Sequence, residues 1–224
     1  MSERVKTGIK KLDDMMNGGL IDGDIALVSG EPGTGKSTLA TMFLVEGMDH
    51  GEPGVYISLE EKKGKFYNHM KSFGWDLEKY EKEKKLHFEV LRGEDLKKHV
   101  ENGSQMFDSI IDKMKAKRVV IDSISAYAHI FPTEMERRNR IRDLFDTIER
   151  WNVTCLMTGE AEQPERDYGV DYMVDATINM RNLLNEKGKR DRYIEIVKMR
   201  GTKHMNGSQY MQLTDRGVEI KGSG

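Results

Sequence analysis

Length, composition and charge limit the classes of protein to which this chain can belong. It has 224 residues, 37% of them hydrophobic and 33% charged, which is enough apolar material for a core and unlike a disordered chain. The formal net charge of −2 excludes a global positive field that would draw the molecule onto nucleic acid or an anionic membrane. The length predicts a single domain over residues 1–221, with 222–224 as a flexible tail.

Cysteine content and hydropathy bear on the compartment in which the chain works. Cys155 is the only cysteine, so an internal disulfide framework and a cysteine-based zinc site are excluded. No run of about 18 apolar residues occurs, and the segment from Met1 to Lys11 lacks the apolar core of a signal peptide. We therefore expect a cytoplasmic protein that neither spans a membrane nor is secreted.

The predicted elements alternate between buried strands and helices, the pattern of a mostly parallel sheet built from βαβ units. In chain order, the apolar β-branched runs that predict strands are 25–29, 55–59, 118–122 and 153–158. Apolar residues at helical spacing predict core-facing helices over 107–114 and 141–148. Thr133 and Glu136 resemble a capping box, which predicts that the second of these helices begins there.

The sequence changes character after Asp175. Residues 176–180 and 193–199 have partly alternating polarity about a charged turn, which predicts a C-terminal β-hairpin. Residues 210–213 and 218–220 predict two further short strands. The expected fold class is therefore α/β, a mostly parallel central β-sheet flanked by helices, with a C-terminal β-hairpin.

One segment carries a strong chemical signal. Residues Gly30 to Ser37 match G-x-x-x-x-G-K-[ST] in full, between the first predicted strand and a helix expected near Thr38. Glycines let backbone N–H groups approach phosphate oxygens, and a helix N-terminus adds unpaired donors and the positive end of its dipole. The motif predicts a P-loop NTPase that binds ATP through Gly30, Gly33, Thr34, Gly35, Lys36, Ser37 and Thr38.

Two ligands for a magnesium ion follow from the same scheme. The Lys36 ammonium would reach the β and γ phosphates, and the Ser37 hydroxyl would ligate Mg²⁺. Asp122 follows the apolar run 119–121 at the end of a predicted strand, where its carboxylate would hold Mg²⁺ through water. An aspartate at a strand end is a weak signal alone, and the phosphate loop strengthens it.

Hydrolysis also needs a group that orients or deprotonates the attacking water. Glu60 and Glu61 directly follow the strand predicted over 55–59, at the carboxyl edge where an open α/β sheet holds its ligand. Strand alternation sends the two side chains to opposite sides, so only one is expected to face the nucleotide. We prefer Glu60 as the catalytic base, with Glu61 as the second candidate.

Beyond the phosphate loop, several segments match one known family over almost the whole chain. They are Thr7-Gly8-Ile9 with Leu12-Asp13 and Gly18-Gly19-Leu20, the segment from Tyr56 to Glu61, Ser72-Phe73-Gly74-Trp75, Ile121-Asp122-Ser123, Tyr168-Gly169-Val170, and the segment from Lys198 to His204. Together they resemble the KaiC family of RecA-superfamily ATPases.

The resemblance implies a RecA-like fold, Mg-ATP as substrate, and a catalytic base within the double glutamate. It also implies that the K-x-R-G-T segment enters the ATP site of a neighbouring subunit. Lys198 and Arg200 would then act in trans on the transferring phosphoryl group, in a homohexameric ring. The family's clock protein has two fused copies of this domain and this chain has one, so a circadian role does not follow.

Two alternatives from other classes stay open. A RecA-type DNA-binding protein would use Arg137, Arg138, Arg140 and Arg142 with the stretch from Lys62 to Lys71, although acidic residues interrupt that helix and favour an ordinary solvated face. A nucleotide-sensing module would bind ATP without hydrolysing it and offer a surface to an unknown protein partner. Self-association with ATP hydrolysis is favoured over both.

Overall fold

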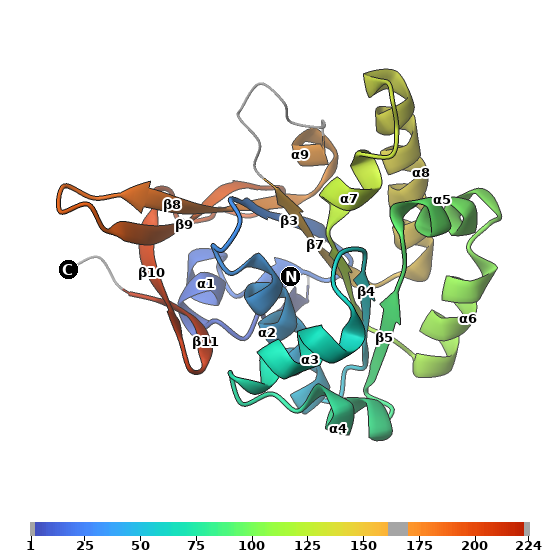
Figure 1. Cartoon of the computed structure of the whole chain (residues 1–224), viewed down its shortest axis with the longest axis horizontal. Helices are drawn as coiled ribbons and strands as arrows, with labels where there is room; N and C mark the ends of the chain where they lie inside the picture. The colour runs from blue at the N-terminus through green and yellow to red at the C-terminus, as the bar shows by residue number, and fades with distance from the viewer. Residues whose placement is uncertain (1–2, 161–169, 222–224) are drawn as a thin grey trace.

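The computed structural model describes residues 3–160 and 170–221 (Figure 1). Its strands are β1 (Arg4–Val5), β2 (Leu20–Ile21), β3 (Ile25–Gly30), β4 (Gly54–Ser58), β5 (Leu86–Val90), β6 (Arg118–Asp122), β7 (Thr154–Glu160), β8 (Ala176–Leu184), β9 (Arg190–Met199), β10 (Gln209–Thr214) and β11 (Gly217–Ile220). Its helices are α1 (Lys10–Met15), α2 (Lys36–Asp49), α3 (Lys63–Lys71), α4 (Leu77–Lys82), α5 (Gly93–Glu101), α6 (Gln105–Met114), α7 (Ile124–Ala128), α8 (Glu134–Trp151) and α9 (Val170–Met173).

Within the described residues the main sheet has nine strands in the order β11-β10-β9-β8-β3-β7-β6-β4-β5. Neighbouring strands from β8 to β5 run parallel, and β9, β10 and β11 continue the sheet in antiparallel pairs. The parallel strands therefore end together at one edge, which positions the side chains that follow them.

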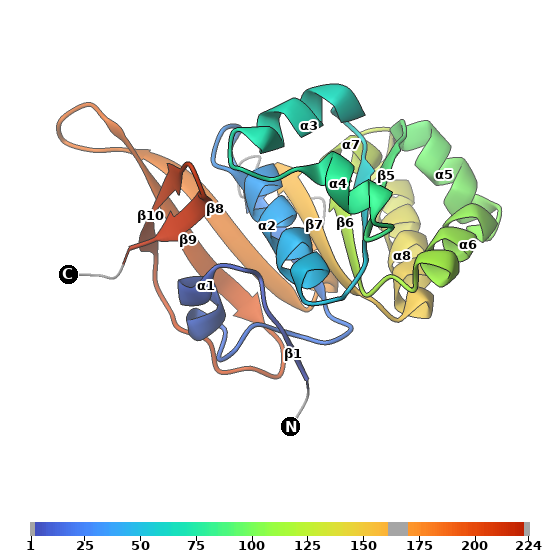
Figure 2. The ribbon, with the colours of Figure 1, turned by 90° about the horizontal axis from the view of Figure 1, so that it is seen from below.

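Helices cover both faces of the parallel part of the sheet (Figure 2). The residues of β3 show why: Ala26 and Val28 join a core with α1, α2, α3 and α4, whereas Ile25 and Leu27 join a second core with α5, α6, α7 and α8. A strand buried on both faces reads as a continuous apolar run, which is the pattern that predicted it. The antiparallel strands lie on the side of the molecule away from α5 and α6 (Figure 2), and residues of β9, β10 and β11 pack in the same core as α1 and α2.

The predicted α/β fold with a C-terminal β-hairpin is confirmed. The four predicted parallel strands correspond to β3, β4, β6 and β7, and the two halves of the hairpin to β8 and β9, which run further than predicted. The predicted tail, 222–224, lies outside the described residues. In the part of the chain that the structure describes, no helix is long and apolar enough to cross a bilayer.

Candidate functional site

The phosphate loop joins the end of β3 to the start of α2. Its backbone is left-handed at Gly33, with φ of 78°, and at Gly35, with φ of 103°, a region that favours glycine. Gly35 is the N-cap residue of α2, and no side chain in the described ranges caps that first turn. The loop therefore presents a helix N-terminus whose backbone donors suit an anion.

Strands from late in the chain pack tightly against this loop. A Cβ atom on Gly30 would collide with the main-chain oxygen of Met180 in β8, and one on Gly35 would lie 2.8 Å from Leu213 Cδ2 in β10. The Arg192 side chain of β9 donates from Nε to the Gly33 carbonyl at 3.3 Å. The shape of the loop thus depends on β8, β9 and β10 as well as on the motif itself.

The Lys36 side chain lies folded over the loop. Its Nζ donates to the carbonyl of Gly30 at 2.8 Å and to that of Glu31 at 3.1 Å. The Thr34 hydroxyl donates to the same Glu31 carbonyl at 2.8 Å, and the Thr34 and Thr38 side chains are buried. The Lys36 ammonium thus donates hydrogen bonds to carbonyls of the loop, where the motif predicts that it contacts phosphate.

Four carboxylates act on this ammonium. Burial lowers the pKa of Lys36, and the charges of Glu160, Asp122, Glu60 and Glu31 oppose that shift, in decreasing order. The first three of these acids follow or end three different strands, β7, β6 and β4, which meet at the same edge of the sheet. The fold therefore gathers charges that lie far apart in the sequence around one lysine.

Asp122 ends β6 and is held on both sides. Its Oδ2 accepts a hydrogen bond of 2.5 Å from the Tyr56 hydroxyl of β4, and its Oδ1 accepts one from the Thr158 hydroxyl of β7. The pKa of Tyr56 is raised well above its ordinary value, first by burial and then by the Asp122 charge, while the nearby Ser37 side chain acts the other way. Ser37, Tyr56 and Asp122 therefore lie close together.

The two candidate bases have different surroundings. The Ser123 hydroxyl donates to Glu60 Oε1, and the Glu60 charge acts on Lys36. Glu61 instead pairs with Lys65 at 3.3 Å and with His69 at 3.2 Å, both on α3. The two carboxylates thus have different partners, with Glu60 near the loop lysine and Glu61 paired with α3, and the choice of base stays a prediction.

Glu160 was not singled out from the sequence. It ends β7, is paired in parallel register with Gly30 of the loop strand, and exerts the largest charge effect on Lys36. The Ser125 hydroxyl accepts a hydrogen bond from its backbone N–H at 2.8 Å. The apolar run that predicted this strand stopped at residue 158, so the pattern gave no signal for a carboxylate at the strand end.

The donor set fits a magnesium ion bound together with a nucleotide. Ser37 and Asp122 offer hydroxyl and carboxylate oxygens, which are the hard ligands that Mg²⁺ prefers. Across residues 3–160 and 170–221, no group of three or more His, Cys, Asp or Glu side chains could hold a metal ion by itself. A metal at Ser37 and Asp122 would therefore take further oxygens from phosphate and water, as Mg²⁺ commonly does.

Lys198 and Arg200 lie at the opposite edge of the sheet from the loop of their own chain. Met199 between them pairs with Ala176 at the start of β8, whereas the loop residue Gly30 pairs with Met180 further along that strand. Along β8, Ala176 and Met180 are four residues apart, at about 3.3 Å per residue. This separation keeps Lys198 and Arg200 away from a phosphate bound in the loop of the same chain.

The Lys198 and Arg200 side chains hydrogen-bond to α9 and to the two residues that follow it. Lys198 Nζ donates to the carbonyl of Val174 at 2.6 Å and to that of Asp171 at 3.0 Å. Arg200 donates to the Tyr172 carbonyl at 2.9 Å and to Asp175 Oδ1 at 3.1 Å. Tyr168 and Gly169, which contributed to the family resemblance, lie outside the described residues.

Many of the basic residues proposed for a DNA-binding alternative, among them Arg137 and Arg140, make contacts within the chain. Arg140 pairs with Glu101 at 3.1 Å, and Arg137 donates to the Ala128 carbonyl at 3.2 Å. In the Lys62 to Lys71 stretch, ion pairs join Lys63 to Glu81, Lys65 to Glu61, and Lys71 to Glu78. These surfaces carry interspersed charges of both signs, unlike a surface built to bind phosphates.

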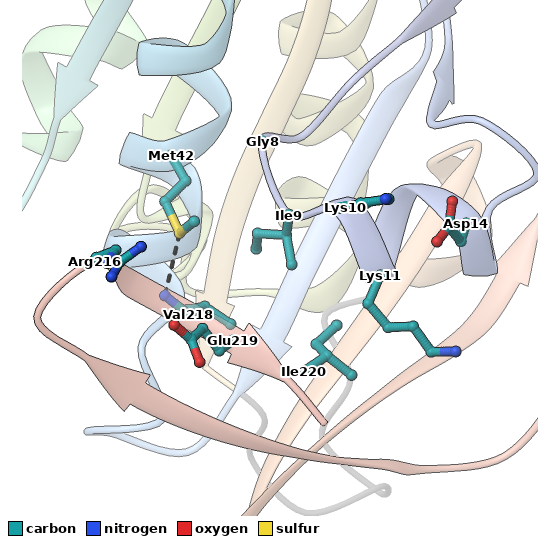
Figure 3. Close-up of a pocket in the computed structure, with 10 residues that line it drawn as sticks. All are labelled: Gly8, Ile9, Lys10, Lys11, Asp14, Met42, Arg216, Val218, Glu219 and Ile220. Atoms are coloured by element: carbon teal, nitrogen blue, oxygen red, sulfur yellow. Dashed lines mark hydrogen bonds between the residues drawn. The ribbon is translucent and has the colours of Figure 1, made fainter. Parts of the chain in front are cut away.

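A separate pocket of about 500 Å³ lies between α1, α2 and β11 (Figure 3). Ile9, Met42 and Val218 supply apolar lining, and Lys11 and Glu219 supply charges of opposite sign. None of the predicted site residues lines it. This pocket is therefore distinct from the phosphate loop.

Comparison with known proteins places this arrangement in a family. The family model described as "ATPase: KaiC" matches residues 5–224 of this chain. The chain belongs to the KaiC family of ATPases. Membership and the loop geometry together support ATP binding by this KaiC-family chain.

Its relatives include both long and short proteins. The circadian clock oscillator protein KaiC of Synechococcus elongatus is 34% identical over 232 residues, which cover 97% of this chain and 44% of that protein. A UPF0273 protein of Thermotoga maritima is 32% identical over 236 residues, covering 98% of this chain and 96% of that protein. The chain thus spans less than half of the clock proteins it matches and nearly all of this shorter relative.

A solved structure supports the fold. The KaiC-like protein from the hyperthermophilic archaeon Pyrococcus horikoshii OT3 matches with a TM-score of 0.87 and 31% sequence identity, covering 99% of this chain and 100% of that chain. The RecA-type fold predicted for this KaiC-family chain is confirmed.

Proposed function

We propose that this KaiC-family chain binds Mg-ATP at Gly30 to Ser37 and hydrolyses it, in a site completed by a neighbouring copy of the chain. The observation that carries the proposal is the convergence of Asp122 and Glu60 on the loop lysine, Lys36, at the carboxyl edge of the sheet. A bare anion site needs no such acids, whereas metal-assisted hydrolysis needs both a metal ligand and a base.

Each residue takes one role in this scheme. Lys36 would exchange the loop carbonyls for the β and γ phosphates, and Ser37 and Asp122 would hold Mg²⁺. Glu60, oriented by the Ser123 hydroxyl, accepts a proton from the attacking water. When bound, Mg²⁺ supplies positive charge for the γ-phosphoryl group.

Substitution of Glu60 tests the hydrolytic part of the proposal. Glu60→Gln should lower the rate of ATP turnover at least about 100-fold, because positioned general bases contribute factors of that order. Mg-ATP affinity, measured by calorimetry, should persist because the phosphate loop is untouched.

Glu61→Gln is the matched control, since its carboxylate pairs with α3 instead. Equal loss in both variants, or full turnover in Glu60→Gln, would remove Glu60 from the role of base. Binding without turnover in the wild-type chain would leave the nucleotide-sensing alternative.

The assembly part of the proposal rests on the opposite-edge position of Lys198 and Arg200 and on the family. Two exposed apolar residues lie beside these cations: Tyr172, which is 74% exposed and whose carbonyl accepts from Arg200, and Val197, which precedes Lys198 in β9. Apolar residues exposed in this way on α9 and β9 suit burial between copies. Mass in solution, measured with and without Mg-ATP, should show a homohexameric ring, and a monomer under both conditions would contradict a shared site.

A further inference from the structure

The carboxylate of Asp122 is clamped between two hydroxyl groups from the strands on either side of it. The sheet places β6 between β4 and β7, and each neighbour contributes one donor. Tyr56 of β4 donates to Oδ2 at 2.5 Å, and Thr158 of β7 donates to Oδ1. Both carboxylate oxygens thus have a fixed partner, and each keeps a further lone pair to accept another bond.

The two donors have little freedom to move. Tyr56 is 1% exposed and Thr158 is 0% exposed. The Tyr56 ring stacks on Phe88 with ring centroids 4.9 Å apart, and Phe66 lies 4.7 Å from it on a tilted plane. Thr158 is β-branched, which restricts its side-chain rotation within a strand. The packing therefore fixes the orientation of the Asp122 carboxylate before any ligand binds.

The chemistry of the clamp suits a metal ligand better than an ion pair would. Hydroxyl donors are neutral, so they orient Asp122 without cancelling the negative charge that attracts a cation. The same Tyr56 phenol lies near the Ser37 side chain, the other predicted metal ligand, which acts to lower the Tyr56 pKa. One buried phenol therefore lies beside both predicted ligands.

We propose that Tyr56 and Thr158 are positioning residues for the magnesium site, which hold the Asp122 carboxylate in the orientation that binds the metal of Mg-ATP. The inference rests on the proposed function and deepens it. A purely structural role for the two hydroxyls would affect folding stability and leave the magnesium requirement of nucleotide binding unchanged.

The test removes one hydroxyl at a time with little change in shape. Tyr56→Phe and Thr158→Val keep the ring and the branched side chain, and Thr158→Ser keeps the hydroxyl as the conservative control. Fluorescent ATP-analogue binding is titrated with Mg²⁺, and metal binding is read independently from the electron paramagnetic resonance signal of free Mn²⁺ in the presence of nucleotide. Circular dichroism checks that each variant is folded.

Tyr56→Phe and Thr158→Val should each require about 10-fold more Mg²⁺ or Mn²⁺, the lower end of what loss of a partner behind a metal ligand costs. Nucleotide affinity in EDTA should equal that of the wild type, and Thr158→Ser should restore the wild-type metal requirement. If Tyr56→Phe does not fold, the Thr158 pair decides the outcome.

Wild-type metal dependence in the folded hydroxyl-free variants would overturn this inference while leaving Mg-ATP binding intact. Absence of Mg-ATP binding by the wild-type chain would instead overturn the proposed function, and the clamp with it.

Discussion

Gly35 has a left-handed backbone conformation and is closely packed against β10. Its φ is 103°, and Leu213 lies where a Cβ would come within 2.8 Å. We expect Gly35→Ala to lower stability by about 1–3 kcal/mol through backbone strain and to weaken nucleotide binding because the loop must shift. Chemical denaturation and calorimetric titration with Mg-ATP measure the two effects.

Gly51→Ala is the matched control, because Gly51 has φ of 82° and nothing within 4 Å of the added Cβ. It should lose stability through strain and keep its nucleotide affinity. Equal nucleotide affinity in Gly35→Ala and wild type would show that the contact with β10 does not shape the loop.

Asp24 makes stability depend on pH. Burial is the main cause that raises its pKa from 3.8 to about 6, and the nearby Asp175 charge adds to the shift. Because the folded state binds the proton more tightly than the unfolded state, Asp24 lowers stability as pH rises from about 4 through 6.

We expect Asp24→Asn to raise the free energy of unfolding at pH 8 by about 1 kcal/mol. The full shift corresponds to about 3 kcal/mol, and partial solvent exposure reduces it. The amide oxygen can still accept from the Ile21 N–H, which Asp24 binds at 3.2 Å. Urea denaturation at pH 4 and pH 8 checks the sign, and an equal gain at both values would contradict it.

Sequence reasoning at the level of residues reached the groups that belong to a contiguous motif or follow a strand directly. Lys36, Ser37 and Asp122 are of this kind. Tyr56 reads only as an apolar strand residue, and its partner Asp122 is 66 positions away along the chain. Such a contact depends on which strands become neighbours, and nothing in the local pattern states it.

Among the elements, α8 tests a predicted helix start. The Thr133 hydroxyl accepts from the Glu136 N–H at 3.2 Å, and the helix begins at Glu134 as the capping pattern predicts. Thr133→Ala should lower the free energy of unfolding by about 1 kcal/mol, and Thr133→Ser should not. Denaturant titration measures both, and no difference between them would show that the cap contributes nothing.

Element prediction succeeded where strands are buried on both faces and was incomplete at the edge. The strand β5 was not predicted, because its buried residues, Leu86 and Phe88, alternate with the partly exposed His87 and Glu89. Alternation of this kind, between charged helices, is typical of an edge strand and gives a weak signal. The apolar runs 25–28 of β3 and 119–121 of β6 gave a strong one.

At the scale of the whole molecule, the opposite-edge position of Arg200 makes site sharing testable. Arg200→Ala subunits keep an intact phosphate loop, and Lys36→Ala subunits keep Arg200. An equal mixture should recover up to about a quarter of wild-type turnover, because each shared site needs one intact component from each neighbour at a head-to-tail interface.

Each variant alone should be inactive in the same assay. Co-assembly is checked by mass, since Arg200 also bonds the end of α9 and its loss must not prevent ring formation. Co-assembled rings without recovered turnover would assign the whole reaction to single subunits.

The central place of β3 has a consequence for biosynthesis. Its two hydrogen-bonded neighbours come from much later in the chain, since Ile25 pairs with Cys155 and Ala26 with Ala176. The ribosome synthesises β3 long before β7 and β8, so β3 is unpaired in the early nascent chain. At that stage the strands that support the phosphate loop are absent. ATP therefore cannot stabilise the early stages of folding by binding to the loop. We expect a fragment that ends before β8 not to bind nucleotide.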